Sequence, residues 1–195
     1  PWDGEDEIPG KAADGAKALI DELHSALDPK AYRKAVALLA ESEFIDIFGV
    51  ENSLTPAMDL FTKLGYLGLT CRLNTDAYLQ QVGAGHLPHG AVAVAFSHSG
   101  SSADTVKALR LAKSHGAKTI AITNAIGAPL ASWADVTLLT GRDSHTIYGN
   151  AIFSRVADTA LVDMLYMGVI LSDYGRFSTA LDESGRMIRD RVCEN

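Results

Sequence analysis

An unbroken apolar run, Ala91 to Phe96, constrains the fold of this chain more than any other feature. A strand that faces water on one side alternates polar and apolar residues, whereas this run is apolar at every position. It therefore predicts a strand covered on both faces, as in a parallel sheet between helices. A helical pattern follows from Ala103 to His115, and strand followed by helix is the repeating unit of such sheets.

The same alternation of strand and helix continues along the chain. Further strands are predicted at Phe44–Phe48, Leu67–Leu73, Lys118–Ile122 and Asp135–Leu139. Helices are predicted at Lys11–Leu27, Asp28–Glu41, Ser53–Leu64, Thr75–Val82, Ile147–Leu171 and Thr179–Arg191. The pattern indicates an α/β fold, a three-layer doubly wound sheet of five parallel strands. A flavodoxin-like strand order of 2-1-3-4-5 is expected, with extra helices at both ends.

Length and composition favour one domain. The chain has 195 residues, 47% of them hydrophobic, which is enough for a single well-buried core. We expect this domain to span residues 11–195, with its core at about 29–171. Residues 1–10 are acidic and contain Pro and Gly, which is typical of a linker. Because the chain starts at Pro1, we expect a further segment upstream.

Charge and cysteine content exclude several classes of protein. A net charge of −7 disfavours direct binding of this segment to nucleic acid. Cys71 and Cys193 fit no disulfide or metal spacing, and we expect a cytoplasmic protein. The apolar segment from Ala151 to Leu171 contains Arg155 and two aspartates, so it predicts a buried helix and no membrane span. Walker and dinucleotide-binding motifs are absent, and no cofactor or metal is expected.

A hydroxyl-rich turn, Ser97-His98-Ser99-Gly100-Ser101-Ser102, joins the apolar strand to the next helix. Backbone N–H groups at a helix N-terminus attract anions, and short hydroxyl side chains add donors without crowding them. Gly100 lets the backbone come close to a ligand. An ordinary loop with a serine cap explains one or two of these serines, but four favour an anion site. In a 2-1-3-4-5 sheet, the turn containing Asn52 and Ser53 lies beside it.

These residues resemble the signature of sugar isomerase (SIS) domains, Ser-x-Ser-Gly-x-Ser/Thr-x-x-Thr. Ile47-Phe48-Gly49 before Ser53, the segment from Gly116 to Asn124, and Pro129-Leu130-Ala131 support the likeness. It covers about residues 29–171. The Ser-His-Ser-Gly sequence and Ser154-Arg155 are most similar to the effector domain of RpiR-type transcriptional regulators, which follows a helix-turn-helix domain.

The resemblance implies a function and a site. Ser53, Ser97, Ser99 and Ser102 match the phosphosugar-binding positions of the family, and Thr123 and Asn124 lie where the family closes its site. His98, Gly100 and Ser101 complete the predicted site, with Asn52 as a further candidate. The expected ligand is a phosphorylated sugar or amino sugar. The resemblance also implies a homodimer or higher oligomer, with the helix around Val156–Ile170 as a candidate interface. DNA would bind only through an upstream helix-turn-helix domain.

Glu51 departs from the family, which usually has glycine at this position. A carboxylate repels a phosphate unless it faces the sugar, so we expect Glu51 to point to solvent or to contact a hydroxyl or amine of the ligand. An alternative function is a sugar-phosphate isomerase, with Glu51 and His98 as base and acid. The long helix from Ile147 offers no glutamate for that role, which favours the sensor.

Three other histidines are weaker candidates. His86 and His89 have a His-x-x-His spacing within a Gly/Pro loop, which is more typical of a solvated loop than of a metal site. His145 precedes the last long helix beside Arg142, in a region that often contributes to sites of this family.

Overall fold

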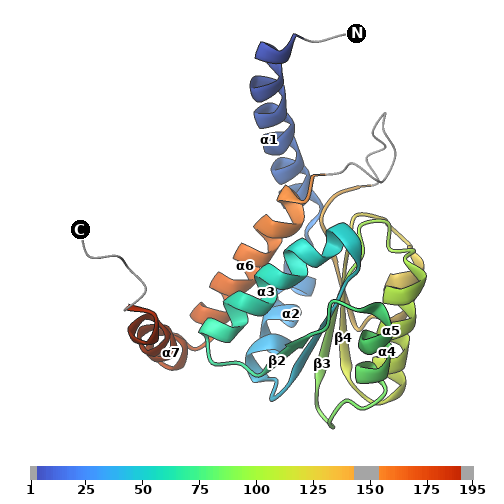
Figure 1. The fold of residues 1–195 in the computed structure, drawn as a ribbon, viewed down its shortest axis with the longest axis vertical. Helices are drawn as coiled ribbons and strands as arrows, with labels where there is room; N and C mark the ends of the chain where they lie inside the picture. Colours follow the sequence, from blue (N-terminus) through green and yellow to red (C-terminus); the bar gives the residue numbers. More distant parts are fainter. Residues whose placement is uncertain (1–3, 143–153, 190–195) are drawn as a thin grey trace.

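The computed structural model describes residues 4–142 and 154–189. Five parallel strands form one sheet in the order β2-β1-β3-β4-β5, which confirms the predicted fold class (Figure 1). The strands are β1 (Ile45–Phe48), β2 (Cys71–Leu73), β3 (Val92–Phe96), β4 (Lys118–Thr123) and β5 (Val136–Leu139). Every residue of β1 and β3 is buried. The apolar run is therefore the covered strand that its composition predicts.

Helices cover both faces of the sheet and make the predicted three layers (Figure 1). One layer contains α2 (Pro29–Glu41), α3 (Leu54–Tyr66) and α6 (Val156–Ser172). The opposite layer contains α4 (Ala77–Ala84) and α5 (Ala103–Ser114). The last helix described, α7 (Tyr174–Met187), packs on α6 and α3.

Alternate residues of β3 point into two different cores. Val92, Val94 and Phe96 belong to the larger core beneath α2, α3 and α6. Ala93 and Ala95 belong to the smaller one beneath α4 and α5. Side chains of a strand alternate between its faces, so an unbroken apolar run supplies both cores at once. Because Ala93 and Ala95 have small side chains, α5 can pack close to the sheet on this face, where its Ala108 and Ala112 join the same core.

Several element boundaries differ from their predicted positions. Helix α1 (Ile8–Ala26) begins three residues before the predicted start, within the segment expected to be a linker. Pro9 lies in its first turn, where the missing N–H costs little. A short 3₁₀ helix, Glu5–Glu7, precedes it. Strand β2 is shorter than predicted, because the chain turns at Gly68, whose φ is +71°. Helix α3 is longer than predicted and runs past Gly65 to Tyr66.

The C-terminal helices also differ in extent. Helix α7 begins at Tyr174, five residues before the predicted start, because the carboxylate of Asp173 accepts the backbone N–H of Arg176 and caps it. Of the long helix predicted from Ile147, residues 147–153 lie outside the described part, and α6 begins at Val156. The predicted start of α2 is confirmed: Asp28 accepts the backbone N–H groups of Lys30 and Ala31.

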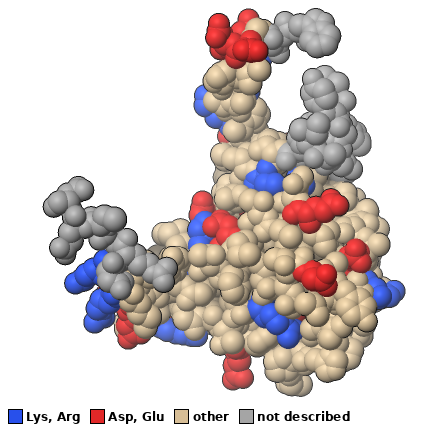
Figure 2. All heavy atoms as spheres, in the orientation of Figure 1, with Lys and Arg blue, Asp and Glu red and all other residues tan. Residues whose placement is uncertain are grey.

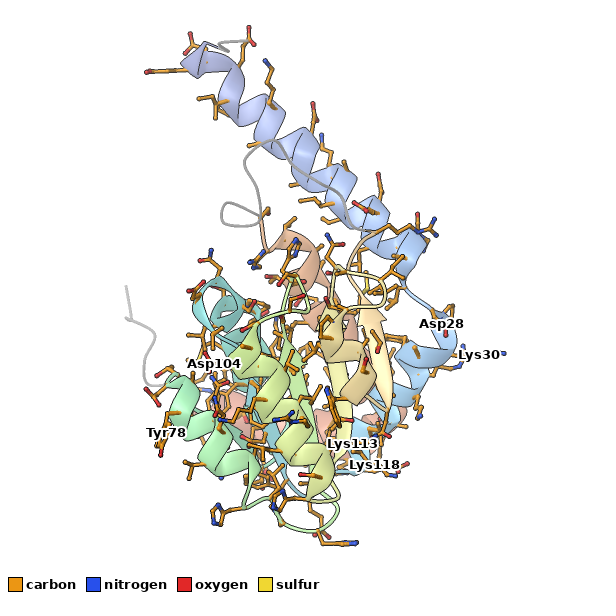
Figure 3. All side chains as sticks on the ribbon, turned by 90° about the vertical axis from the view of Figure 1, so that its right-hand side faces the viewer. Asp28, Lys30, Tyr78, Asp104, Lys113 and Lys118 are labelled. Atoms are coloured by element: carbon orange, nitrogen blue, oxygen red, sulfur yellow. The ribbon has the colours of Figure 1, made fainter. Side chains whose placement is uncertain are left out.

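Helix α1 extends away from the body of the molecule, from the end of the sheet where the parallel strands finish (Figures 1 and 3). Burial of the helix is concentrated in its C-terminal half: Leu23 is buried, and residues 8–15 are exposed. Acidic and basic side chains are interspersed over the face drawn in Figure 2. Among the helices described, none has the length and hydropathy that a membrane span requires.

Candidate functional site

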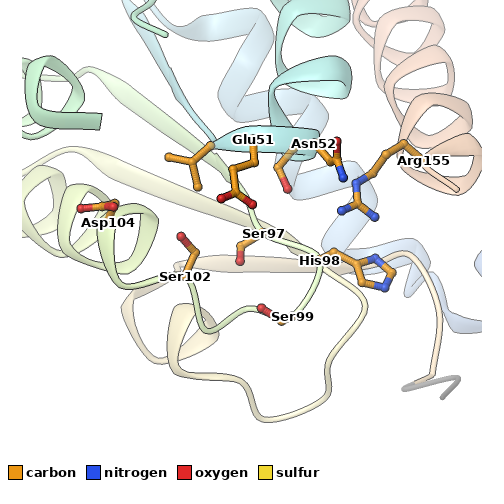
Figure 4. A pocket seen from close by; sticks show the side chains of 10 residues that line it. Glu51, Asn52, Ser97, His98, Ser99, Ser102, Asp104 and Arg155 are labelled. Atoms are coloured by element: carbon orange, nitrogen blue, oxygen red, sulfur yellow. The ribbon is translucent and has the colours of Figure 1, made fainter. Parts of the chain in front are cut away.

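A pocket of about 490 Å³ lies at the carboxyl ends of β1 and β3, as the strand order predicts (Figure 4). Two turns supply most of its lining. Val50, Glu51, Asn52 and Ser53 come from the turn after β1, and Ser97, His98, Ser99 and Ser102 from the turn after β3. Asp104 and Arg155 complete it. The structure therefore brings together seven predicted residues that are far apart in the sequence.

Gly100 shapes the turn after β3. Its φ is +60°, and a Cβ there would lie 2.8 Å from Oγ1 of Thr123 and would collide with Ala128. Its N–H donates to the backbone oxygen of Ser97 at 2.9 Å, and its own oxygen accepts the N–H of Leu130 at 2.9 Å. Only glycine fits this conformation and this space. Gly100 does not line the pocket; it folds the turn that does.

Three predicted residues support or border the site and are not among its lining. Oγ1 of Thr123 and the backbone N–H of Asn124 both donate to the backbone oxygen of His98, at 3.1 and 3.0 Å. These bonds hold the turn from behind. Ser101 is exposed, and its hydroxyl donates to the backbone oxygen of Ser99 at 3.2 Å.

Ser53 and Ser102 occupy the N-cap positions of α3 and α5 without making the capping hydrogen bond. A serine at this position usually caps the helix by accepting a backbone N–H. Here both side chains line the pocket instead. Two helix N-termini therefore face one cavity with their positive dipole ends, together with hydroxyl groups. This arrangement is suited to an anion.

Arg155 is the main residue of the site that the sequence analysis missed, since it was used there only for the family resemblance and against a membrane span. Its guanidinium reaches into the pocket from the residue before α6 (Figure 4). Its side chain is 13% exposed, and its Nε lies 3.8 Å from Oδ2 of Asp158. Among the described residues, its buried Nε and Nη1 have no hydrogen-bond partner. The sequence did contain one indication of its role: an arginine is unusual within an apolar segment such as Ala151 to Leu171.

Burial and the nearby Arg155 charge both hold the pKa of His98 below its ordinary value. Both effects favour the neutral imidazole of His98, and the guanidinium of Arg155 is the positive charge among the residues that line the pocket. The buried carboxyl of Asp158 beside Arg155 has a raised pKa, because desolvation outweighs its hydrogen bond to Thr140 and its attraction to Arg155.

Glu51 is exposed and also lines the pocket, so its position is compatible with both expected alternatives, contact with solvent and contact with a ligand. Its carboxylate points toward Ser97 and Ser102 in Figure 4. Its φ is +50°, a conformation that favours glycine, which explains the glycine usual in the resembled family. With Asp104 it gives the pocket an acidic side opposite Arg155 and His98 (Figure 4).

The other histidine predictions add nothing to this pocket. His86 and His89 do not line it, and Nδ1 of His86 lies 2.9 Å from the backbone oxygen of Val82. Within the described ranges, no group of three His, Cys, Asp or Glu side chains is placed to hold a metal ion. His145 lies outside the described residues.

The whole sequence was compared with known protein families and solved structures. The model of the SIS domain family matches residues 38–168. The chain belongs to the SIS domain family. A helix-turn-helix transcriptional regulator of Caldanaerobacter subterraneus is 30% identical over 185 residues, which are 95% of this chain and 66% of the regulator. The chain thus spans about two thirds or less of the length of the curated relatives it matches.

Two solved structures share the fold of this SIS domain. NanR of Vibrio vulnificus, in complex with ManNAc-6P, superimposes with a TM-score of 0.89 at 24% identity, over 96% of this chain and 70% of NanR. The sugar isomerase domain of an RpiR transcription factor from Sphaerobacter thermophilus gives 0.83 at 22% identity, over 92% of this chain and 99% of that domain. These two structures show the shared fold. The resemblance to RpiR-type regulators is confirmed by the curated relatives, which include RpiR of Escherichia coli, 24% identical over 87% of this chain and 54% of that regulator.

Proposed function

We propose that this SIS domain is the effector domain of an RpiR-type transcriptional regulator and binds a phosphorylated sugar or amino sugar in the pocket. The observation that carries the proposal is the convergence of four serines and two helix N-termini on one cavity. Hydrogen bonds to a charged group contribute roughly 1.5–3 kcal/mol each. Three or four of them suffice to hold a phosphate without a Walker lysine.

The remaining lining groups suit a sugar. Asn52, Glu51 and Arg155 offer acceptors and donors beyond the serines, and a cavity of about 490 Å³ has room for a hexose phosphate. ManNAc-6P in NanR supports a ligand of this class for the present pocket. Bound ligand would shift a homodimer between states that position an upstream helix-turn-helix domain on DNA. We expect the whole protein to act in the cytoplasm.

An isomerase is the second candidate, because Glu51 and His98 line the same pocket. Aldose–ketose isomerisation needs a base and an acid at adjacent carbons. The exposed Glu51 is poorly shielded for that chemistry, and the described part of α6 presents no glutamate. Incubation with aldose and ketose phosphates decides between the two: measurable turnover contradicts a sensor without activity.

Ser99→Ala tests the ligand site directly. We expect the variant to bind a sugar phosphate more weakly by roughly 1.5–3 kcal/mol, the value of a charge-assisted hydrogen bond. Calorimetry with N-acetylmannosamine 6-phosphate, glucosamine 6-phosphate and glucose 6-phosphate measures it. Ser101→Ala is the matched control, because Ser101 is exposed in the same turn and does not line the pocket. Equal losses of affinity in both variants, or no loss in Ser99→Ala, would contradict the proposed phosphate site.

A further inference from the structure

The turn after β5 joins helix α1 to the region of the pocket. The backbone N–H of Arg142 donates to Oε1 of Glu22 at 2.7 Å, and Nη2 of Arg142 donates to the backbone oxygen of Ser25 at 3.0 Å. Glu22 and Ser25 belong to the C-terminal half of α1. Two hydrogen bonds therefore fix the position of this turn relative to the helix.

Gly141 transmits this restraint inward. It is buried between Glu22 and Asn124: a Cβ on Gly141 would lie 3.3 Å from Cδ of Glu22 and 3.0 Å from Cγ of Asn124. The side chain of Asn124 is packed against the turn, and among the described residues its buried Oδ1 has no hydrogen-bond partner. The side chains of Asn124 and Glu22 thus occupy the space that a Cβ on Gly141 would need, and both pack beside its backbone. Because protein interiors are closely packed, a displacement of the turn would displace Asn124.

Asn124 in turn supports His98 in the pocket wall. Its backbone N–H donates to the backbone oxygen of His98 at 3.0 Å, and its Nδ2 lies 3.5 Å from Nε2 of His98. His98 is thus held through both its backbone and its ring from a residue that touches the α1-linked turn.

A second connection reaches Arg155 from the same turn. The backbone N–H of Thr140 donates to the backbone oxygen of Thr123 at 3.0 Å, and its side chain is near enough to the carboxyl of Asp158 to lower the pKa of that group. Asp158 is the carboxylate beside Arg155. The turn at 140–142 therefore lies next to residues that contact His98 and Arg155, the two basic residues of the pocket.

We propose that Glu22 is a positioning residue for the ligand pocket: by holding the Arg142 backbone it fixes Gly141 against Asn124 and so fixes His98. Glu22 does not line the pocket and acts through the turn. The inference rests on the proposed function only in that the pocket binds a ligand. Because coupling between two sites is reciprocal, a ligand that shifts His98 also changes the restraint on α1.

Amide hydrogen exchange tests this connection without any ligand. In the full chain, Glu22→Ala removes the acceptor of the Arg142 N–H, whereas Glu22→Gln keeps an oxygen acceptor and removes only the charge. We expect Glu22→Ala to raise exchange in peptides covering 97–100 and 120–125, and Glu22→Gln to restore slow exchange. Asp21→Ala, an exposed carboxylate on the same helix, is the control. Unchanged exchange at 97–100 and 120–125 would overturn the proposal. A rise throughout the chain, residues 71–84 included, would also overturn it.

Affinity provides the second readout. We expect Glu22→Ala to bind N-acetylmannosamine 6-phosphate or glucose 6-phosphate several-fold more weakly than the wild-type chain, and Glu22→Gln and Asp21→Ala to bind it equally well. Equal affinity in Glu22→Ala would overturn a positioning role. If the wild-type chain binds no sugar phosphate, the proposed function fails, and hydrogen exchange alone decides whether Glu22 holds the pocket wall.

Discussion

Glu51 combines a strained backbone with a charge that faces an anion site. Its φ of +50° lies in the left-handed region, which costs a non-glycine residue of order 1 kcal/mol or more. Its carboxylate also lines the pocket with the serines. Strain of this kind usually persists where the residue serves the site, so the identity of Glu51 bears on which ligand is bound.

Two substitutions separate strain from charge at Glu51. Glu51→Gly removes both, and we expect higher stability, by about 1 kcal/mol, and tighter binding of glucose 6-phosphate. Glu51→Gln keeps the strain and removes the charge, so we expect tighter binding without the gain in stability. Urea unfolding and calorimetry measure the two effects. If both variants bind more weakly than the wild-type chain, Glu51 contacts the ligand favourably and does not repel it.

His98 and Arg155 are neighbours in the pocket, and the charge of Arg155 acts on the imidazole of His98. Burial and then the Arg155 charge lower the pKa of His98. Arg155→Gln should therefore raise the pKa of His98 toward its ordinary value, and burial should keep it from reaching that value. Since a lowered histidine pKa costs stability as pH falls toward it, the variant should lose less stability on acidification. An NMR titration of the imidazole checks the pKa, with Arg110→Gln as the control. An unchanged midpoint would contradict this coupling.

Among the elements, the helix N-termini differ in what their first side chains do. Asp28 caps α2 with two hydrogen bonds, whereas Ser102 stands at the N-cap of α5 without making one. We expect Asp28→Ala to lower the free energy of unfolding by about 1 kcal/mol and Ser102→Ala to lower it by much less. Ligand binding should show the opposite ranking. Denaturant unfolding and calorimetry of the two variants test this. Comparable losses of stability would mean that Ser102 is a structural cap.

Periodicity and turn chemistry predicted the elements well where both signals were present. The apolar run from Ala91 to Phe96 and the Asp28-Pro29 cap predicted a central strand and a helix start that the structure confirms. Boundaries failed where tertiary packing decided them. Leu67 and Leu69 are buried like strand residues, but they lie in the turn around Gly68.

The pocket was predicted in part. The serine turn and Ser53 were found because strand order places the carboxyl ends of β1 and β3 together. Arg155 was missed because it reaches the pocket from a distant element, and no local pattern records that approach. Gly100, Thr123 and Asn124 are not among the residues that line the pocket and shape or support the turn behind it; their contact with a ligand stays a prediction. Spacing alone does not distinguish these two roles.

For the whole molecule, dimerisation stays a prediction, and α6 offers the surface for it. Met167 and Leu171 are 51% and 68% exposed beside an apolar groove of about 460 Å³. We expect the wild-type chain to dimerise and Met167→Glu to be monomeric at the same concentration. Tyr78→Glu, on α4 in the opposite layer and 73% exposed, should remain dimeric. Light scattering after size exclusion measures the mass. A monomeric wild-type chain would contradict the predicted dimer, and a dimeric Met167→Glu variant would place the contact elsewhere.

Helix α1 has a mechanical consequence that follows from its length. Ile8 stands about 21 Å beyond Glu22 along a helix with a rise of about 1.5 Å per residue. Residues 8–15 are exposed, and the buried residue of the helix, Leu23, lies in its C-terminal half. A tilt of about 10° at the base would carry the tip through about 4 Å, by the geometry of a rigid rod of this length. A rotation of α1 about its C-terminal half is therefore amplified along the helix, so that Ile8 moves much further than Glu22 and Ser25, which contact Arg142.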